Sequence, residues 1–201
     1  MLPSVLWARD RYLKPGGEMY PCTATLFLAP ITDEGIEERL VDWKQMKDLY
    51  GVSMESIKSL SNDALTVRAD SQHLNPESVL ASACQLCKLD LMTIKVQDAH
   101  FVKADFDFKC YGHNTMHGFA TWFTVSFPGG VTIDTSPFSL PTHWGQTVMY
   151  LRKFVDVEQD SRIKGIYRMQ PSTDNPRFWD IDVEFEVNSD EKISQSWHCS
   201  D

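Results

Sequence analysis

The sequence contains no apolar run long enough to cross a membrane, and its basic residues are outnumbered. Lysine and arginine total 19 against 28 aspartates and glutamates, so the formal net charge is −9. A membrane-spanning helix needs about 20 consecutive apolar residues, and binding to nucleic-acid phosphates needs a basic surface. We therefore expect no membrane insertion and no direct nucleic-acid binding, whereas an arginine-rich partner is compatible with this charge.

Cysteine is also scarce. The five cysteines are an odd, scattered set: Cys22, Cys84, Cys87, Cys110 and Cys199. Residues 1–3 are not followed by the basic segment and apolar core of a signal peptide. The sequence therefore predicts reduced thiols in a protein that is not secreted, rather than a disulfide framework.

Several signatures of catalysis are missing from these 201 residues. No glycine-rich phosphate loop follows an expected strand, and neither a Walker motif nor a Gly-x-Ser-x-Gly elbow is present. Cys84 and Cys87 form a CxxC, but a zinc site needs further ligands nearby, so structural thiols are favoured. His113 and His117 have the spacing of two ligands on one helix face, but the flanking glycines favour a turn that enters a strand. The chain thus shows no complete catalytic constellation of its own.

The residues that are present indicate a mainly β fold. A hydrophobic fraction of 42% in 201 residues is enough for one large domain with a real core. Alternation with a period of two predicts strands at residues 19–31, 105–110, 119–127 and 179–187. The last of these has an acidic outer face. Turn-forming residues separate the later runs, at residues 111–114, 128–130 and 172–176. Many strands without long helices between them favour an antiparallel β-barrel or sandwich.

Helical patterns occur only in the first third of the chain. Residues 1–13 predict a helix that ends at the Lys-Pro-Gly-Gly of residues 14–17. Residues 35–50 predict an amphipathic helix, and a short helix follows at residues 54–60. The apolar stripe of this pair either packs on the chain's own core or forms an arm that docks elsewhere. Periodicity alone favours the core. Strands dominate from Leu65 onward, and the polar tail after Val187 can be fixed by Ile193 and Trp197.

The most informative stretch is residues 135–150, TSPFSLPTHWGQTVMY. At its centre, Thr142, His143 and Trp144 join a titratable imidazole to a large aromatic side chain in a loop bounded by proline. A loop that leads into a strand can place a histidine at a cleft. Taken alone, the pair has a second interpretation, namely a histidine and a tryptophan packed together for structural reasons.

This triplet resembles the Thr-His-Trp loop of the protein arginine N-methyltransferases, and the resemblance runs nearly end to end. It is carried by VLWARD and LKPGG at residues 5–10 and 13–17, LYGVSM at 49–54, MHGFATWF and FPGG at 116–123 and 127–130, and VEQD and DNPR at 157–160 and 174–177. On these motifs the chain is identified as a member of that family, within one branch of its type I enzymes.

The resemblance implies an architecture that periodicity does not. A full-length family member has a Rossmann-like domain that binds S-adenosylmethionine, a β-barrel, and a helical dimerisation arm inserted in the barrel. We therefore expect residues 1–18 to be a helix-strand remnant of the Rossmann-like methyltransferase domain. Residues 19–201 would form the β-barrel substrate-binding domain, with the arm at about residues 32–62. The helical stripe of residues 35–60 is then assigned to the arm rather than to the core.

The resemblance also implies roles for individual residues. His143 corresponds to a histidine that helps to build the arginine pocket and pairs with an acidic residue outside these 201 residues. Thr142 and Trp144 correspond to the loop that shapes the pocket, and Met1 to a methionine at the junction of cofactor and substrate. Three residues correspond to positions on the arm: Trp43, Tyr50 and Met54.

The family transfers methyl groups from S-adenosylmethionine to arginine in proteins, and histone tails are typical substrates of the indicated branch. Its double-glutamate loop and glycine-rich cofactor loop have no counterpart in these 201 residues, because Met1 and Leu2 match the residues that follow the second glutamate. We therefore expect the isolated chain to bind no cofactor by itself and to be inactive or nearly so.

Two further interpretations remain open. The chain can be a non-catalytic interaction module that forms a homodimer or oligomer, or that pairs with an intact family member. It can also be a fragment without an independent role. The branch implies a nuclear location, with the cytoplasm as the alternative.

Overall fold

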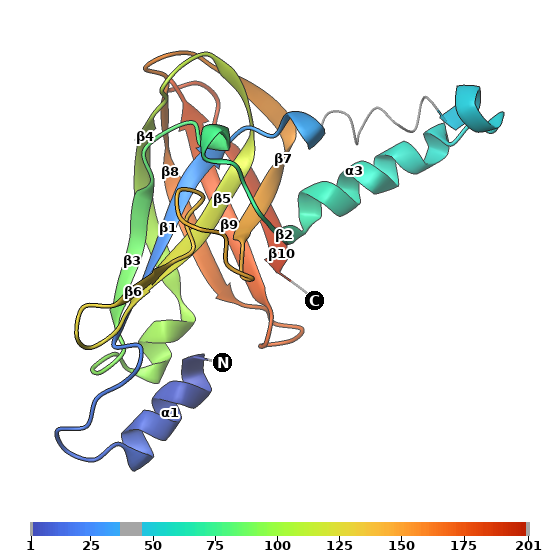
Figure 1. The fold of residues 1–201 in the computed structure, drawn as a ribbon. Coiled ribbons are helices and arrows are strands. Elements are labelled where there is room, and N and C mark those ends of the chain that lie inside the picture. The colour runs from blue at the N-terminus through green and yellow to red at the C-terminus, as the bar shows by residue number, and fades with distance from the viewer. Residues whose placement is uncertain (1, 37–45, 200–201) are drawn as a thin grey trace.

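The computed structural model describes residues 2–36 and 46–199, which form two antiparallel β-sheets packed face to face (Figure 1). The first sheet has the order β2-β7-β5-β1-β3, and β6 pairs with β5. Its strands are β1 (Thr23–Ile31), β2 (Ala69–Gln72), β3 (Cys84–Asp90), β5 (Asn114–Ser126), β6 (Thr132–Asp134) and β7 (Gln146–Val157). The second sheet has the order β10-β9-β8-β4, and its strands are β4 (Val102–Lys109), β8 (Arg162–Pro171), β9 (Trp179–Val187) and β10 (Ile193–Cys199).

This arrangement confirms the mainly β, antiparallel barrel-or-sandwich fold. The sheets approach each other at two edges, where β3 lies by β4 and β2 lies by β10. Among the described residues, only isolated bridges such as Arg68 with His198 join the two sheets, so they do not close into one continuous ladder. No helix in the described ranges combines the length and the apolar character that a membrane crossing requires.

The alternation of strand β9 shows how the core is built. Its residues alternate between buried and partly exposed, as the period of two predicts. Ile181, Val183 and Phe185 face the core, and the acidic residues between them face outward. Strand β10 pairs with β9 along its length, and Trp197 is fully buried. The polar tail is therefore fixed by its apolar residues, as the sequence indicates.

Strand β5 is buried on both faces. Phe119 packs in the core between the sheets, whereas Trp122 packs in a second apolar cluster on the other face. The β5–β7 register shifts between Met116 and Gly118, and a Cβ atom at Gly118 would lie 2.2 Å from the Met149 carbonyl oxygen. Only glycine fits there. The bulge turns the side chain of His117, which lies between these residues, toward the segment that follows β1.

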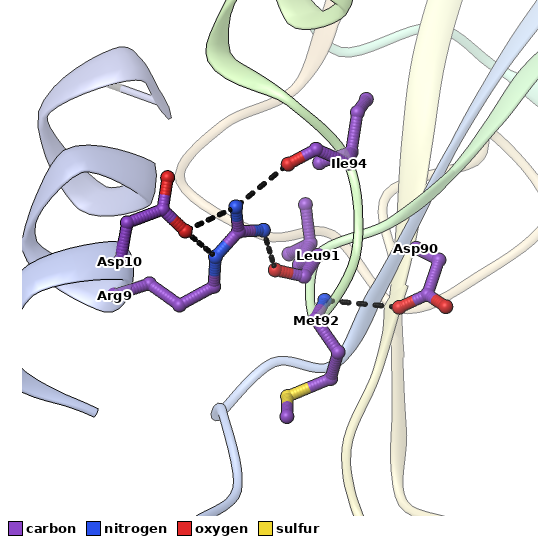
Figure 2. A network of polar contacts seen from close by, with 6 residues as sticks. All are labelled: Arg9, Asp10, Asp90, Leu91, Met92 and Ile94. Atoms are coloured by element: carbon purple, nitrogen blue, oxygen red, sulfur yellow. Dashed lines mark hydrogen bonds and ion pairs between the residues drawn. The ribbon is translucent and has the colours of Figure 1, made fainter. Parts of the chain in front are cut away.

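Helix α1 (Leu2–Tyr12) packs against the loop between β3 and β4. That loop contains the short helix η3 (Val96–His100). Leu6 is fully buried, and the Arg9 guanidinium donates hydrogen bonds of 2.7 Å to the carbonyls of Leu91 and Ile94 (Figure 2). The helix is therefore attached to the barrel through one apolar and one charged side chain.

The helical excursion between β1 and β2 is described in part. A helix begins after Asp33, residues 46–50 are helical, and Gly51 ends that segment with a φ of 71°. The short helix η1 (Glu55–Ile57) and helix α3 (Lys58–Val67) follow. Figure 1 shows α3 extending away from the sheets, with its C-terminal end at β2. Another short helix, η2 (Pro76–Ser78), lies between β2 and β3.

Several sequence-based boundaries were wrong. The strands expected at residues 105–110 and 119–127 begin earlier, at Val102 and Asn114. Strand β1 begins at Thr23 rather than at residue 19, because Pro21 has no N–H to donate to a ladder. The helix expected at residues 54–60 continues to Val67, where the Thr66 carbonyl accepts a hydrogen bond of 2.8 Å from Gln195. This contact supports the last turn, and sequence periodicity could not reveal it.

Candidate functional site

The Thr-His-Trp loop connects β6 to β7 and is fixed by hydrogen bonds on both sides. On the β6 side, the Asp134 carboxylate accepts from the backbone N–H and hydroxyl of Ser136 and from the hydroxyl of Ser139. On the β7 side, the buried Gln146 amide donates to the Thr135 carbonyl at 2.7 Å and accepts from the Leu74 N–H at 2.8 Å. The loop is therefore an ordered part of the structure.

His143 and Trp144 form a tilted ring pair in this loop. Their ring centroids lie 4.0 Å apart with an angle of 33° between the planes. Trp144 also contacts Phe123 of β5 edge to face, with centroids 5.8 Å apart. Both side chains nevertheless remain exposed, Trp144 by 46%. The pair is thus packed and is still presented to solvent, so packing does not exclude a role in binding.

The backbone on each side of His143 is held by residues of β2 and its end. The Ser71 hydroxyl donates to the Trp144 carbonyl at 2.6 Å. The His73 Nε2 atom lies 2.7 Å from the Thr142 carbonyl oxygen. Because a carbonyl only accepts, Nε2 of His73 carries the proton of this bond. The peptide units that flank His143 are thus anchored while its imidazole stays exposed.

Gly145 is required by this close approach. Its φ is 59°, and a Cβ atom there would lie 2.6 Å from the Gln72 carbonyl oxygen. Its N–H donates to the Thr142 carbonyl at 3.3 Å, which closes the turn. The Thr142 hydroxyl oxygen is buried without a hydrogen-bond partner. A left-handed residue in contact with a neighbouring strand can hardly be anything other than glycine.

A family model described as the arginine methyltransferase oligomerization subdomain matches residues 22–190. The chain belongs to the protein arginine methyltransferase family. This match and the architecture identify it as the C-terminal domain of such a protein.

Two curated relatives carry the name protein arginine N-methyltransferase 6, in agreement with the branch that the motifs indicate. The Xenopus laevis protein is 43% identical over 180 residues, which cover 88% of this chain and 53% of the relative. The Danio rerio protein is 38% identical over 209 residues, which cover 100% of this chain and 59% of the relative. The chain therefore spans little more than half the length of these arginine methyltransferases.

A solved structure supports the same assignment. The Trypanosoma brucei PRMT1 enzyme-prozyme heterotetrameric complex with AdoHcy contains a chain that superposes with a TM-score of 0.85 at 26% identity. The similarity covers 100% of this chain and 63% of that chain. Oligomerisation and a cofactor product are thus features of an arginine methyltransferase with this barrel.

The structure describes only part of the predicted family site. Thr142, His143 and Trp144 come together in one loop, whereas Met1 and Trp43 lie outside the described residues. Tyr50 is 71% exposed and Met54 is partly buried. Tyr50 belongs to a row of exposed apolar side chains on the helical excursion: Leu49, Tyr50, Val52, Ile57 and Leu60.

The other motifs that could bind a metal or react are structural in this fold. Cys84 and Cys87 lie on β3 and are free thiols, and burial raises the pKa of each. His113 lies in a turn and pairs with Glu158 at 3.0 Å, whereas His117 lies in the β5 bulge, so they share no helix face. Within the described ranges, no group of three or more His, Cys, Asp or Glu side chains could hold a metal ion.

Four residues for which the sequence predicted no role surround the loop and the start of β2. Ser71, Gln72 and His73 follow α3, and Tyr150 lies four residues into β7. Ser71 is separated from Trp144 by 73 residues, so no local pattern connects them.

Proposed function

We propose that these 201 residues supply the substrate-binding barrel and the dimerisation arm of a protein arginine methyltransferase, together with one wall of its arginine site. In this assignment residues 1–18 belong with the cofactor domain, and the arm occupies about residues 32–62. The observation that supports it is the exposed, tilted His143–Trp144 ring pair on an anchored loop. Histone tails, with their basic side chains, are the substrate class that the family branch suggests, and the nucleus is the corresponding location.

The chemistry of the His143–Trp144 pair suits the binding of a guanidinium. A cation over an indole face gains about 0.5 to 2 kcal/mol, depending on how far the pair is desolvated. An imidazole beside the indole can orient the bound group through a hydrogen bond. Because the backbone on each side of His143 is anchored, little ordering would be needed when the substrate binds. The loop would therefore orient an arginine rather than react with it.

The described residues do not fit S-adenosylmethionine. A Rossmann-type cradle needs a glycine-rich turn between a strand and the helix that follows it. The strand-to-helix turn after β1 instead contains Thr32 and Asp33, and Asp33 caps the helix through the Gly35 N–H. Met1 lies outside the described residues. Cofactor binding is thus assigned to a domain beyond the barrel, and the isolated 201-residue polypeptide is expected to be inactive.

Calorimetry and a methylation assay test the first part of this proposal. Titration of S-adenosylmethionine into the isolated polypeptide should give no binding heat, and a histone-tail peptide should remain unmethylated. Robust turnover by the pure chain would contradict the assignment.

A chimera tests the arginine site itself. Joining the chain to the cofactor-binding domain of the Xenopus laevis relative should give a methyltransferase. In it, His143→Ala should lower kcat/KM about a hundredfold, as the loss of a positioning contact does. His113→Ala is the matched control, since His113 is also exposed but pairs with Glu158 in another loop. Equal losses in the two variants would contradict the assignment of His143.

The exposed apolar row on the arm favours a second candidate function. A non-catalytic module that pairs with an intact family member would need such a surface. Leu60 and Tyr50 are 68% and 71% exposed, which is unusual for apolar side chains of their size. Mixing the chain with an intact relative should then give a complex whose mass is the sum of both, and Leu60→Glu should prevent it. A complex that also restores turnover to a catalytically dead relative would favour the first proposal instead.

A further inference from the structure

The strand that anchors the Thr-His-Trp loop is also the strand into which the arm returns. Helix α3 ends at Val67 and β2 begins at Ala69, so one residue separates them. Strand β2 pairs with β7, and its last pair joins Gln72 to Gln146, next to the loop. A shift of α3 would therefore move β2 directly.

The contacts from β2 to the loop are made with the backbone on both sides of His143. Ser71 donates to the Trp144 carbonyl, and His73 donates to the Thr142 carbonyl. Between them, the Gln72 carbonyl occupies the space that a side chain at Gly145 would need. A displacement of β2 therefore changes the position of the imidazole without any direct contact to its ring.

Tyr150 of β7 connects both ends of the arm to the same strand. Its phenol donates to Asp33, where the chain leaves the barrel, and lies 3.1 Å from the side-chain amide of Gln72. Its carbonyl accepts from the Gln195 amide at 2.9 Å, and that amide also donates to the Thr66 carbonyl at 2.8 Å, in the last turn of α3. Both roots of the arm thus meet at one buried tyrosine.

We infer that Ser71, His73 and Tyr150 are positioning residues that couple the arm to the Thr-His-Trp loop, so that fixing the arm against a partner also fixes His143. The inference rests on the proposed function only in two names: it calls the loop an arginine site, and it calls the helical segment between β1 and β2 an assembly arm. The coupling itself is a property of the hydrogen bonds among β2, β7 and the loop. Tyr150 acts on the loop through Gln72, and β2 acts on it directly.

Amide hydrogen exchange of the 201-residue polypeptide tests this coupling without any methyl transfer. Ser71→Ala should speed exchange in peptides covering residues 141–146 about fivefold, which corresponds to one exposed hydrogen bond. Ser71→Thr keeps the hydroxyl and should restore the original rate. Ser82→Ala is the matched control, because Ser82 is also exposed and bonds to Tyr111, outside this network.

Tyr150→Phe tests the connection to the arm. It should speed exchange in the same loop peptides and at the end of α3, relative to β9 core peptides that report global stability. Tyr111→Phe, which removes an exposed phenol bonded to Ser82, should leave the loop unchanged. Loop exchange that stays within about twofold of the original in both Ser71→Ala and Tyr150→Phe would overturn the coupling.

Self-association adds a third comparison. If the chain assembles through its arm, loop protection should rise with protein concentration, and Ser71→Ala with His73→Ala should weaken that rise. If the chain stays monomeric, the proposed arm function fails while the Tyr150→Phe result still decides the coupling. A chimera that transfers no methyl group would likewise leave the exchange result standing.

Discussion

The guanidinium of Arg9 donates a hydrogen bond of 2.7 Å to the main-chain carbonyl of Leu91, across 82 residues of sequence (Figure 2). A second hydrogen bond, also of 2.7 Å, reaches the Ile94 carbonyl, and Asp10 pairs with the same guanidinium. The Arg9 side chain is only 8% exposed, so these contacts are shielded from water. One arginine thus attaches α1 to the loop between β3 and β4.

Replacing Arg9 with alanine should release α1 from the barrel. The two charge-assisted hydrogen bonds together should contribute about 2 kcal/mol to docking, or roughly 30-fold in the exchange of α1 amides. Arg9→Lys should recover only part of this, because an ammonium lacks the planar fork that reaches both carbonyls. Arg11→Ala is the control, since Arg11 lies over the exposed Trp7 ring instead. Unchanged α1 exchange in Arg9→Ala would show that Leu6 alone docks the helix.

Gly145→Ala should displace the Thr-His-Trp loop. A left-handed non-glycine residue costs about 1 to 3 kcal/mol, and the added methyl would lie 2.6 Å from the Gln72 carbonyl oxygen. Urea denaturation should show a loss of at least about 2 kcal/mol. Gly112→Ala is the control, because no atom lies within 4 Å of the added methyl there. Equal stability of the two variants would contradict the close approach of β2 to the loop.

Gln195→Ala should destabilise the junction of helix α3 and strand β7. The buried side chain donates to the carbonyls of Thr66 and Tyr150 and accepts from the Arg152 N–H at 3.0 Å. Leaving the Thr66 carbonyl and the Arg152 N–H without these partners should cost about 2 to 3 kcal/mol in the free energy of unfolding. The Tyr150 carbonyl keeps the hydrogen bond of 2.8 Å that the Trp197 indole donates. Gln170→Ala, on the exposed face of β8, should change it by less than about 0.5 kcal/mol. If Gln195→Ala lowers the free energy of unfolding no more than Gln170→Ala does, the hydrogen bonding assigned to Gln195 is contradicted.

Stability should fall in alkaline solution because of Cys199. Burial, with smaller effects from the Asp180 and Asp70 carboxylates, raises the pKa of this thiol from 9.0 to about 11. Between these values the unfolded chain loses the proton while the folded chain retains it, so stability is complete below pH 9 and declines toward pH 11. The loss should reach about 2 to 3 kcal/mol.

The matched measurement compares Cys199→Ala with the parent chain by urea denaturation at pH 8 and at pH 10.5. The variant should show a smaller difference between the two pH values. Cys22→Ala, at a partly exposed position next to β1, should keep the full difference. A parent chain that is equally stable at both pH values would contradict the assignment of a raised pKa to the partly buried Cys199 thiol.

Much of the fold could be predicted because the geometry of a strand is reflected in the order of neighbouring residues. Side chains alternate faces every two residues, so the buried face of β9 is visible in the order of its own nine residues. The Thr-His-Trp loop could also be located, since its residue types and proline boundary are local. The end of α3 could not, because its last turn is supported by Gln195, which is separated from Thr66 by 129 residues.

The sequence by itself indicated four of the strands, the turns that separate the later ones, and the loop that carries the imidazole and the indole, because each of these depends on neighbours within a few residues. Only the tertiary structure decided that Ser71 lies against Trp144, that His143 is exposed between two anchored carbonyls, and that both roots of the arm meet at Tyr150. Hydrogen bonds between distant segments depend on sheet register and on the bulge at His117. The register and the bulge are set by packing of the whole core, so no periodic pattern in the sequence reveals them.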